Sequence, residues 1–359
     1  MVSRQDFRLA ANLLRHKLFG HRFPAHVAIA VTNKCNLRCS YCYSQAAGVF
    51  GNDMTTAQLT ALVDELFAAG TRYIVLTGGE PMVRKDIGQI VDHIIGKGLK
   101  CGMSTNALLF ENRPDVLERL TSINVSLDGD EELHNRNRGT QDYQKILRGI
   151  DLAIAKKVPV SIGCVLTKVN MGCVRFIAEL AKAKGCQCYF HIPYWRANSE
   201  VGERGYTECQ PMSMEETSRV MAEIVEYKNA GYPISYSNRM HAYLRDWPFP
   251  TPTVHRKELA EAMARGFKPI HCLAGDCYCI IDADSSVYPC ASLIGQVRAL
   301  KATEVGFRKA WDFLPTVRCA ACHFFLQNEL NLLFSLDVPT WVNLVKEWPH
   351  LLRQKKPSK

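Results

Sequence analysis

An alternation of short apolar runs with longer segments of helical periodicity, between residues 26 and 229, most constrains the fold of this chain. This alternation indicates a parallel sheet with helices packed outside it. Strands are expected at 26–31, 73–77, 99–104, 123–127, 160–166 and 186–192. Helices are expected at 55–69, 86–97, 114–120, 143–157, 172–184 and 213–229. Six such units rather than eight predict an α/β fold, a partial (β/α)6 TIM-type barrel.

Three cysteines follow the first expected strand directly. Cys35, Cys39 and Cys42 have the spacing C-x3-C-x2-C. Thiolates this close together indicate soft metal ligands rather than disulfide partners. A [4Fe–4S] cluster ligated only by protein thiolates needs four cysteines, so three would leave one iron open for another ligand.

Composition limits the compartment and the partners of the chain. It has 359 residues and 15 cysteines, and no charged and apolar signal peptide begins it. We therefore expect a cytoplasmic, reducing location, in which a disulfide framework is disfavoured. The sequence contains no run of about 18 apolar residues, so a membrane span is not expected. The net charge is +9, but the basic residues are scattered. Because no arginine-rich tract with aromatic residues between the arginines appears, nucleic acid is not an expected partner.

A second group of cysteines lies far along the chain. Cys272 precedes an expected hairpin at 278–283 and 287–289, Cys290 ends that hairpin, and Cys319 and Cys322 follow. Four cysteines are a complete thiolate set for a second [4Fe–4S] cluster. Two alternatives stay open. A structural zinc ion would also accept four thiolates, and Cys277 or Cys279 could replace Cys272.

The run Asn33 to Tyr43 and the turn Thr77-Gly78-Gly79-Glu80-Pro81 resemble the radical S-adenosylmethionine (SAM) superfamily. In that family the open iron chelates SAM, and the reduced cluster cleaves SAM to a 5′-deoxyadenosyl radical that abstracts hydrogen from a substrate. The resemblance implies that Tyr41 packs against the adenine, unless it is a simple packing residue. It also implies that Gly78, Gly79 and Glu80 contact the methionyl amine.

Later strand ends carry further polar residues that this resemblance assigns to SAM. Ser104 and Asn106 end the third strand, and Ser126 and Asp128 end the fourth. Asp128 could instead cap the segment that follows it. In the run from His134 to Gly139, the resemblance favours Arg138 as a SAM contact and gives His134 a structural role.

The segment around Cys272 and Cys290 resembles the twitch domain, a short relative of the SPASM domain, with Ser286 where that family commonly has glycine. Cys322 is the last cysteine, so one auxiliary cluster is expected, with a role in electron transfer. The expected divisions are an N-terminal amphipathic helix (1–25), the radical SAM partial barrel (26–231), a linker or substrate-side insert (232–271), a small Fe–S hairpin domain (272–325), and a C-terminal helix with a basic tail (326–359). The other cysteines are assigned to the core, except Cys209, a weak candidate for a catalytic residue.

The substrate is less constrained than the reaction. An aromatic insert containing Tyr194, Trp195, Tyr206, Tyr232, Tyr236, Tyr243, Trp247 and Phe249 suits a flat, partly apolar molecule, and Arg196, Arg204, Arg239 and His241 suit an anionic group. The same aromatics could equally pack the insert onto the barrel. We expect oxidation of an unactivated C–H bond, foremost methyl hydroxylation or formyl formation on a tetrapyrrole, as in the bacteriochlorophyllide oxidases of this superfamily. Sugar or aminocyclitol dehydrogenation and peptide maturation are the alternatives. Flavodoxin or ferredoxin is the expected reductant.

Overall fold

Eight strands form one curved sheet in the computed structural model, which describes residues 4–39, 41–42, 52–193, 211–254, 256–314 and 319–342. The strands are β1 His26–Thr32, β2 Tyr73–Gly78, β3 Lys100–Thr105, β4 Ser122–Ser126, β5 Val160–Val165, β6 Gln187–His191, β8 Tyr278–Ile281 and β9 Val287–Tyr288. Their order is β6-β5-β4-β3-β2-β1-β8-β9, and β1 to β6 run parallel. The expected partial barrel is therefore confirmed.

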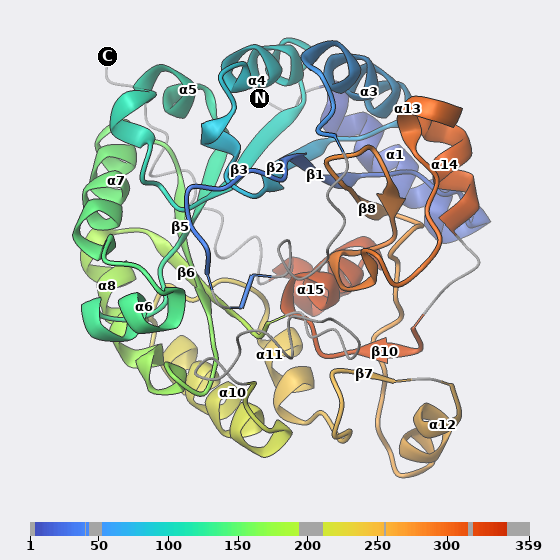
Figure 1. The fold of residues 1–359 in the computed structure, drawn as a ribbon. Coiled ribbons are helices and arrows are strands. Elements are labelled where there is room, and N and C mark those ends of the chain that lie inside the picture. Colours follow the sequence, from blue (N-terminus) through green and yellow to red (C-terminus); the bar gives the residue numbers. More distant parts are fainter. Residues whose placement is uncertain are drawn as a thin grey trace.

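Helices cover the outer face of this sheet, as Figure 1 shows for α3, α4, α5, α7 and α8. The helices are α1 Arg4–Phe19, α3 Thr56–Ala69, α4 Ile87–Gly96, α5 Pro114–Arg119, α6 Glu131–Arg138, α7 Tyr143–Ala155, α8 Val174–Lys184, α10 Met214–Asn229, α11 Asn238–Arg245, α12 Arg256–Ala264, α13 Ala302–Val305, α14 Phe307–Phe313 and α15 Phe325–Phe334. Single 3-10 turns lie at Pro81–Val83, Phe110–Asn112, Met171–Cys173 and Ala291–Leu293. The main core consists of the outward-facing strand residues and the apolar faces of these helices.

The six expected strands and helices all exist, with ends that differ by at most two residues. Ser213 and Glu216 form the capping box that begins α10, because each side chain bonds the backbone N–H of the other residue. The prediction that residues 232–271 are a linker or loop was incomplete. Helices α11 and α12 lie there because the prolines stand outside them, and Ser237 caps α11. Helix α6 was also missed.

The C-terminal hairpin continues the barrel sheet. Strand β8 pairs parallel with β1, from His26 with Tyr278 to Ile29 with Ile281, and β9 pairs antiparallel with β8. Because β8 is parallel to β1, the chain enters β8 and leaves β9 at the amino-terminal edge of the sheet. The two cysteine groups therefore lie at opposite edges, since the Cys35 loop follows the carboxyl end of β1. A seven-residue strand such as β1 spans roughly 20 Å.

Helix α15 crosses the side that the sheet leaves open (Figure 1). At one end the ring of Phe325 packs 5.9 Å from the ring of His191 on β6. Further along, Leu330 shares a small buried cluster with Leu273 and with Tyr278, the first residue of β8. Helix α15 thus connects the two ends of the incomplete barrel.

The inner face of the sheet is lined by small and polar side chains. Thr77, Ser104, Asn124, Ser126 and His191 are all partly exposed there. A closed TIM barrel fills this space with bulky branched residues. The five polar side chains of this inner face are partly exposed instead. None of the helices in the described part of the chain is long and apolar enough to cross a membrane.

Three histidines predict how the stability of this fold depends on pH. His134, His241 and His323 are fully buried, and burial lowers their pKa values from 6.5 to about 4, about 3 and about 4. Between pH 6.5 and 4 the unfolded chain therefore binds more protons than the folded chain, so stability falls as the pH falls. Lowering the pH from 7 to 5 should cost on the order of 2 kcal/mol for each histidine.

Thermal melting of the anaerobically purified protein at pH 7, 6 and 5 tests this prediction. The midpoint should fall at each step. A midpoint that stays constant or rises toward pH 5 would show that these imidazoles are not buried in the neutral form.

Candidate active site: two cysteine groups on one barrel

The Cys35 loop is anchored at its first residues. The Asp53 carboxylate accepts a hydrogen bond from the Thr32 hydroxyl at 2.5 Å and another from the Asn33 N–H at 3.0 Å. The Lys34 N–H donates back to the Thr32 hydroxyl at 3.1 Å. These contacts fix the direction in which the chain leaves β1, and so fix where Cys35 begins the loop.

Two glycines let the end of β2 lie directly against this anchored segment. A Cβ on Gly78 would lie 2.3 Å from the Thr32 carbonyl oxygen, and one on Gly79 would lie 2.2 Å from the Lys34 carbonyl oxygen. Gly78 also has φ of +126°, which favours glycine. The resemblance to the radical SAM superfamily implied that these glycines contact the methionyl amine of SAM. In the structure they let backbone approach the cysteine loop.

Glu80 connects the ends of β2 and β3. Its side chain is 1% exposed, and it accepts hydrogen bonds from the Met82 N–H, the Thr105 hydroxyl at 2.7 Å and the Asn106 N–H at 2.8 Å. Burial raises the pKa of this carboxyl, and these donors oppose the shift. Three of about four acceptor positions are used, which leaves room for one further donor.

Asp128, Tyr41 and Arg138 form a buried group at the end of β4. The Tyr41 hydroxyl donates to the fully buried Asp128 carboxylate. The Arg138 Nε lies 3.4 Å from the same carboxylate, and its guanidinium carbon lies 5.8 Å from the centre of the Tyr41 ring. Arg138 also hydrogen bonds the Cys39 side chain. One face of Tyr41 is thus occupied by Arg138.

The Asp128 carboxylate and backbone N–H make further hydrogen bonds. Its carboxylate accepts from the Val165 N–H at 2.9 Å and from the Asn137 amide, and its own N–H donates to His134 Nδ1. The suggestion that Asp128 caps the next helix was wrong, because the side chain that caps α6 belongs to Asp130. His134 has the structural role expected for it.

Ser104, Ser126 and Asn106 differ in how accessible they are. Ser104 and Ser126 lie partly exposed on the inner face of the sheet. Asn106 is buried, and its amide donates to the Asn36 side chain in the cysteine loop at 2.8 Å. Asn106 therefore positions the loop, whereas the two serines remain available to a ligand in the barrel.

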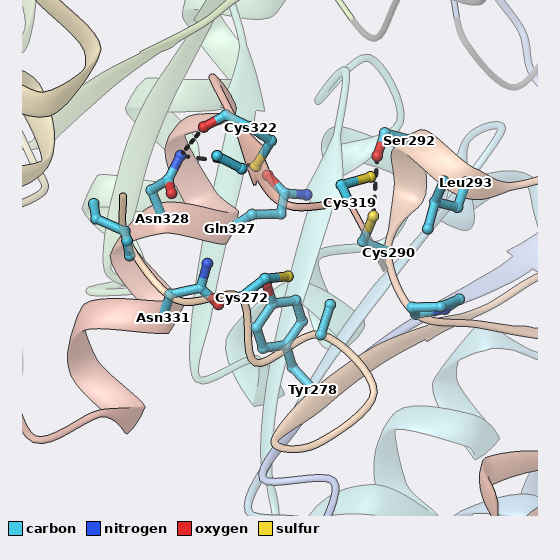
Figure 2. A pocket seen from close by; sticks show the side chains of 14 residues that line it. Cys272, Tyr278, Cys290, Ser292, Leu293, Cys319, Cys322, Gln327, Asn328 and Asn331 are labelled. Carbon is cyan, nitrogen blue, oxygen red and sulfur yellow. Dashed lines mark hydrogen bonds between the residues drawn. The ribbon is translucent and has the colours of Figure 1, made fainter. Parts of the chain in front are cut away.

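The second cysteine group lines one pocket. Cys272, Cys290, Cys319 and Cys322 border it, together with Gln327, Asn328 and Asn331 of α15 (Figure 2). Cys277 is instead buried in the small core beside Leu13, and Cys279 is buried in the main core. The pocket thus selects Cys272 among the three alternatives.

Polar groups surround the thiols of this pocket. The Ser292 hydroxyl lies 3.0 Å from Cys290 Sγ, and the Asn328 amide donates to the Cys322 carbonyl oxygen at 2.9 Å. Burial, followed by the neighbouring Cys272, raises the pKa of the Cys322 thiol. Thiols in this setting release their protons when a metal binds. Among the described residues, no three His, Cys, Asp or Glu side chains are grouped to hold a single metal ion.

Sequence patterns alone left several of these residues unnoticed. Asp53, Asn36 and Asn137 position the cysteine loop and the Asp128 group. Gln327, Asn328 and Asn331 form a polar stripe on helix α15, whose other residues are apolar except Glu329, and their spacing of three and four residues could have been recognised. Cys209 lies outside the described residues, and Cys101, Cys164, Cys173, Cys186 and Cys188 are buried as expected.

The aromatic insert mostly packs on itself. The Trp247 ring lies 5.0 Å from Phe249, 5.7 Å from Tyr243 and 5.5 Å from His323. Tyr236 differs, because it contacts Tyr189 of β6 at 5.6 Å. Arg239 is exposed but pairs with Asp337, whereas His241 is buried and neutral, so the structure does not place the two together as an anion-binding group. Tyr194, Trp195, Arg196, Arg204 and Tyr206 lie outside the described residues.

Residues 29–181, from β1 into α8, match the model of the radical SAM superfamily. This match covers the three-cysteine loop, the Gly78–Gly79 turn and the Asp128 group. The chain contains a radical SAM domain. Domains of this superfamily use a [4Fe–4S] cluster and SAM.

Similar proteins extend the comparison beyond this domain. An AdoMet-dependent heme synthase from Methanosarcina barkeri is 26% identical over 80% of this chain and 82% of its own length. An Fe-coproporphyrin III synthase from the same organism is 28% identical over 55% of this chain and 49% of its own. The SAM-bound structure of Streptococcus suis SuiB has the same fold, with a TM-score of 0.63 and 16% identity over 84% of this chain and 69% of that one.

Gly79→Ala tests how the radical SAM domain builds its loop. The added Cβ would meet the Lys34 backbone, which cannot give way without moving Cys35. We expect the variant to lose most of the iron bound by the Cys35 loop, about four atoms per chain, and most 5′-deoxyadenosine release.

Gly96→Ala is the matched control, because a Cβ there meets nothing within 4 Å. Iron and acid-labile sulfide are counted after anaerobic reconstitution. Full iron loading in Gly79→Ala would contradict the proposed packing of the loop.

Proposed function

We propose that this chain is a radical SAM oxidoreductase that oxidises a C–H bond of a tetrapyrrole carrying carboxylate side chains. One observation carries the reaction class: a group of three cysteines and a group of four lie at opposite edges of one barrel, whose inner face carries partly exposed polar side chains. Three thiolates leave a coordination position open on a [4Fe–4S] cluster, and four close it.

The proposal assigns separate tasks to the two groups. Cys35, Cys39 and Cys42 hold the SAM-binding cluster, and the four pocket cysteines hold the second cluster. The chemistry that the bound groups supply is the reductive cleavage of SAM for hydrogen-atom abstraction, together with one-electron oxidation of the substrate. The donors fit, because the four pocket cysteines border a common space, and because Arg138 opposes the rise that burial causes in the pKa of the Cys39 thiol.

The remaining SAM contacts follow from what each residue still offers. Glu80 retains one acceptor position for the methionyl ammonium, beside the three donors that hold it. The Gly78–Gly79 backbone borders the same place. Ser104 and Ser126 present hydroxyls on the inner face for the carboxylate and ribose. Tyr41, Asn106, Asp128 and Arg138 act mainly by holding the loop beside these contacts.

The interior of the barrel is the proposed place of the substrate. Between the amino-terminal and carboxyl-terminal edges of the sheet, its inner face carries Asn124, Tyr189 and His191, which are all partly exposed. Burial lowers the pKa of His191 to about 4, so it is neutral at pH 7 and can donate one hydrogen bond and accept another. A molecule bound here would lie between the two cysteine groups, within reach of both.

The substrate class rests on the relatives. Proteins named for heme and coproporphyrin synthesis match this chain, the first over four fifths of its length. The aromatic insert adds little, because its described rings mostly pack together. Within this class we propose methyl oxidation to a hydroxymethyl group, in which the methyl carbon loses a hydrogen atom and an electron and water adds with loss of a proton. A second oxidation of the same kind would give the formyl group. No described feature favours a sugar or a peptide, and the likeness to SuiB concerns the fold.

Three cysteine variants, assayed with SAM, a reductant and a carboxylated porphyrin or chlorin, test the assignment. Cys39→Ala should abolish 5′-deoxyadenosine formation, at least a hundredfold. Cys319→Ala should still release 5′-deoxyadenosine but should oxidise the tetrapyrrole at least tenfold more slowly. Cys186→Ala is the matched control, a buried thiol outside both groups that should leave both activities intact.

Product analysis by mass spectrometry distinguishes the parts of the proposal. Persistence of 5′-deoxyadenosine in Cys39→Ala would refute the three-cysteine assignment. Normal oxidation in Cys319→Ala would remove the electron-transfer role from the second group. If no carboxylated tetrapyrrole binds or reacts while 5′-deoxyadenosine is released, only the substrate class is wrong.

A further inference from the structure

Asn331 has a buried amide nitrogen with no partner, on the wall of the four-cysteine pocket. The residue lies on α15 and is 1% exposed. Its Nδ2 is inaccessible to solvent and makes no hydrogen bond. Burying an unsatisfied N–H costs free energy, so each such group in a folded protein needs an explanation.

The orientation of this amide is determined by its oxygen. Asn331 Oδ1 accepts hydrogen bonds from the Leu273 N–H at 2.8 Å and from the Tyr278 hydroxyl at 3.0 Å. A backbone N–H can only donate, so the atom facing Leu273 must be the oxygen. In Figure 2 the oxygen turns toward Tyr278, and the nitrogen turns toward the side where Gln327 and Asn328 line the pocket.

The amide is therefore held in position before any ligand arrives. Leu273 follows Cys272 directly. The hydrogen bond from the Leu273 N–H to Asn331 therefore also fixes the backbone beside Cys272, a proposed ligand of the cluster. Asn328, one turn earlier, has already used its amide on the Cys322 and Phe324 carbonyl oxygens. Asn331 Nδ2 thus remains available as a donor to an acceptor inside the pocket.

We propose that Asn331 Nδ2 donates a hydrogen bond to a sulfur atom of the cluster held by Cys272, Cys290, Cys319 and Cys322, and thereby raises its reduction potential. This inference rests on the proposed function, which places a cluster in the pocket. Reduction adds negative charge to the cluster sulfurs, so a donor stabilises the reduced form more than the oxidised form. The cluster becomes a better acceptor for an electron from the substrate. Asn331 is a positioning and tuning residue that touches neither SAM nor substrate.

The experiment isolates the second cluster and measures its potential directly. The full chain carrying Cys35→Ala, Cys39→Ala and Cys42→Ala should retain only the four-cysteine site, with about four irons. In this background the midpoint potential is measured by redox titration followed by electron paramagnetic resonance. Pulsed electron-nuclear double resonance in H2O and D2O detects an exchangeable proton coupled to the reduced cluster.

Two variants separate the effect of losing the N–H donor from the effect of adding a negative charge. Asn331→Asp keeps an oxygen for Leu273 and Tyr278 but removes the N–H, whereas Asn331→Leu removes the N–H without adding charge. Both should lower the midpoint potential and eliminate one exchangeable proton coupling. Leu330→Ala is the matched control, because it loosens the packing of α15 but removes no donor, and it should leave both measurements unchanged.

The outcomes distinguish this inference from the proposal on which it depends. Failure of the triple variant to bind iron, or binding of zinc alone, would overturn the second cluster itself. A cluster whose proton coupling persists in Asn331→Asp would overturn the role of Asn331, even if Asn331→Leu fails to fold. A potential that falls only in Asn331→Asp would assign the shift to charge and would also overturn it.

Discussion

The buried ion pair of Asp128 and Arg138 is the interaction on which the arrangement of the site depends. Arg138 contacts the Tyr41 ring and Cys39, while Asp128 accepts from the Tyr41 hydroxyl and from the backbone of β5. A buried charge is tolerated only when it is paired and hydrogen-bonded. Removing either partner would therefore leave an uncompensated charge beneath the cysteine loop. The loop is held at its other end by Asp53, and the two ends together determine where the three thiols lie.

The direction of β8 gives the second cysteine group its place. Because β8 continues the sheet parallel to β1, the chain reaches Cys272 and Cys290 at the edge opposite the Cys35 loop. Helix α15 then connects the ends of the incomplete barrel and supplies the amides of the pocket. The same helix that completes the barrel thus supports the second site, and the inner face of the sheet with its partly exposed polar side chains lies between the two groups.

The strands, the helices and the three-cysteine loop could be predicted because each depends on local sequence. Apolar periodicity and the Ser213 capping box are read within one element. The spacing of Cys272 to Cys290 favoured Cys272 by resemblance to the family but left Cys277 and Cys279 open, because the choice depends on which side chains face a pocket lined by α15. The same reason applies to Asn331, whose partners are more than fifty residues away. Composition also could not separate a substrate-binding aromatic insert from one that packs on itself.

Mössbauer spectroscopy of the 57Fe-reconstituted protein, with and without SAM, tests most directly the claim that one cluster is open and the other closed. The account predicts about eight irons per chain, of which SAM changes the environment of one and leaves the others as they were. It would be contradicted if SAM changed none of the irons, or if the chain held only about four irons with zinc in the four-cysteine pocket.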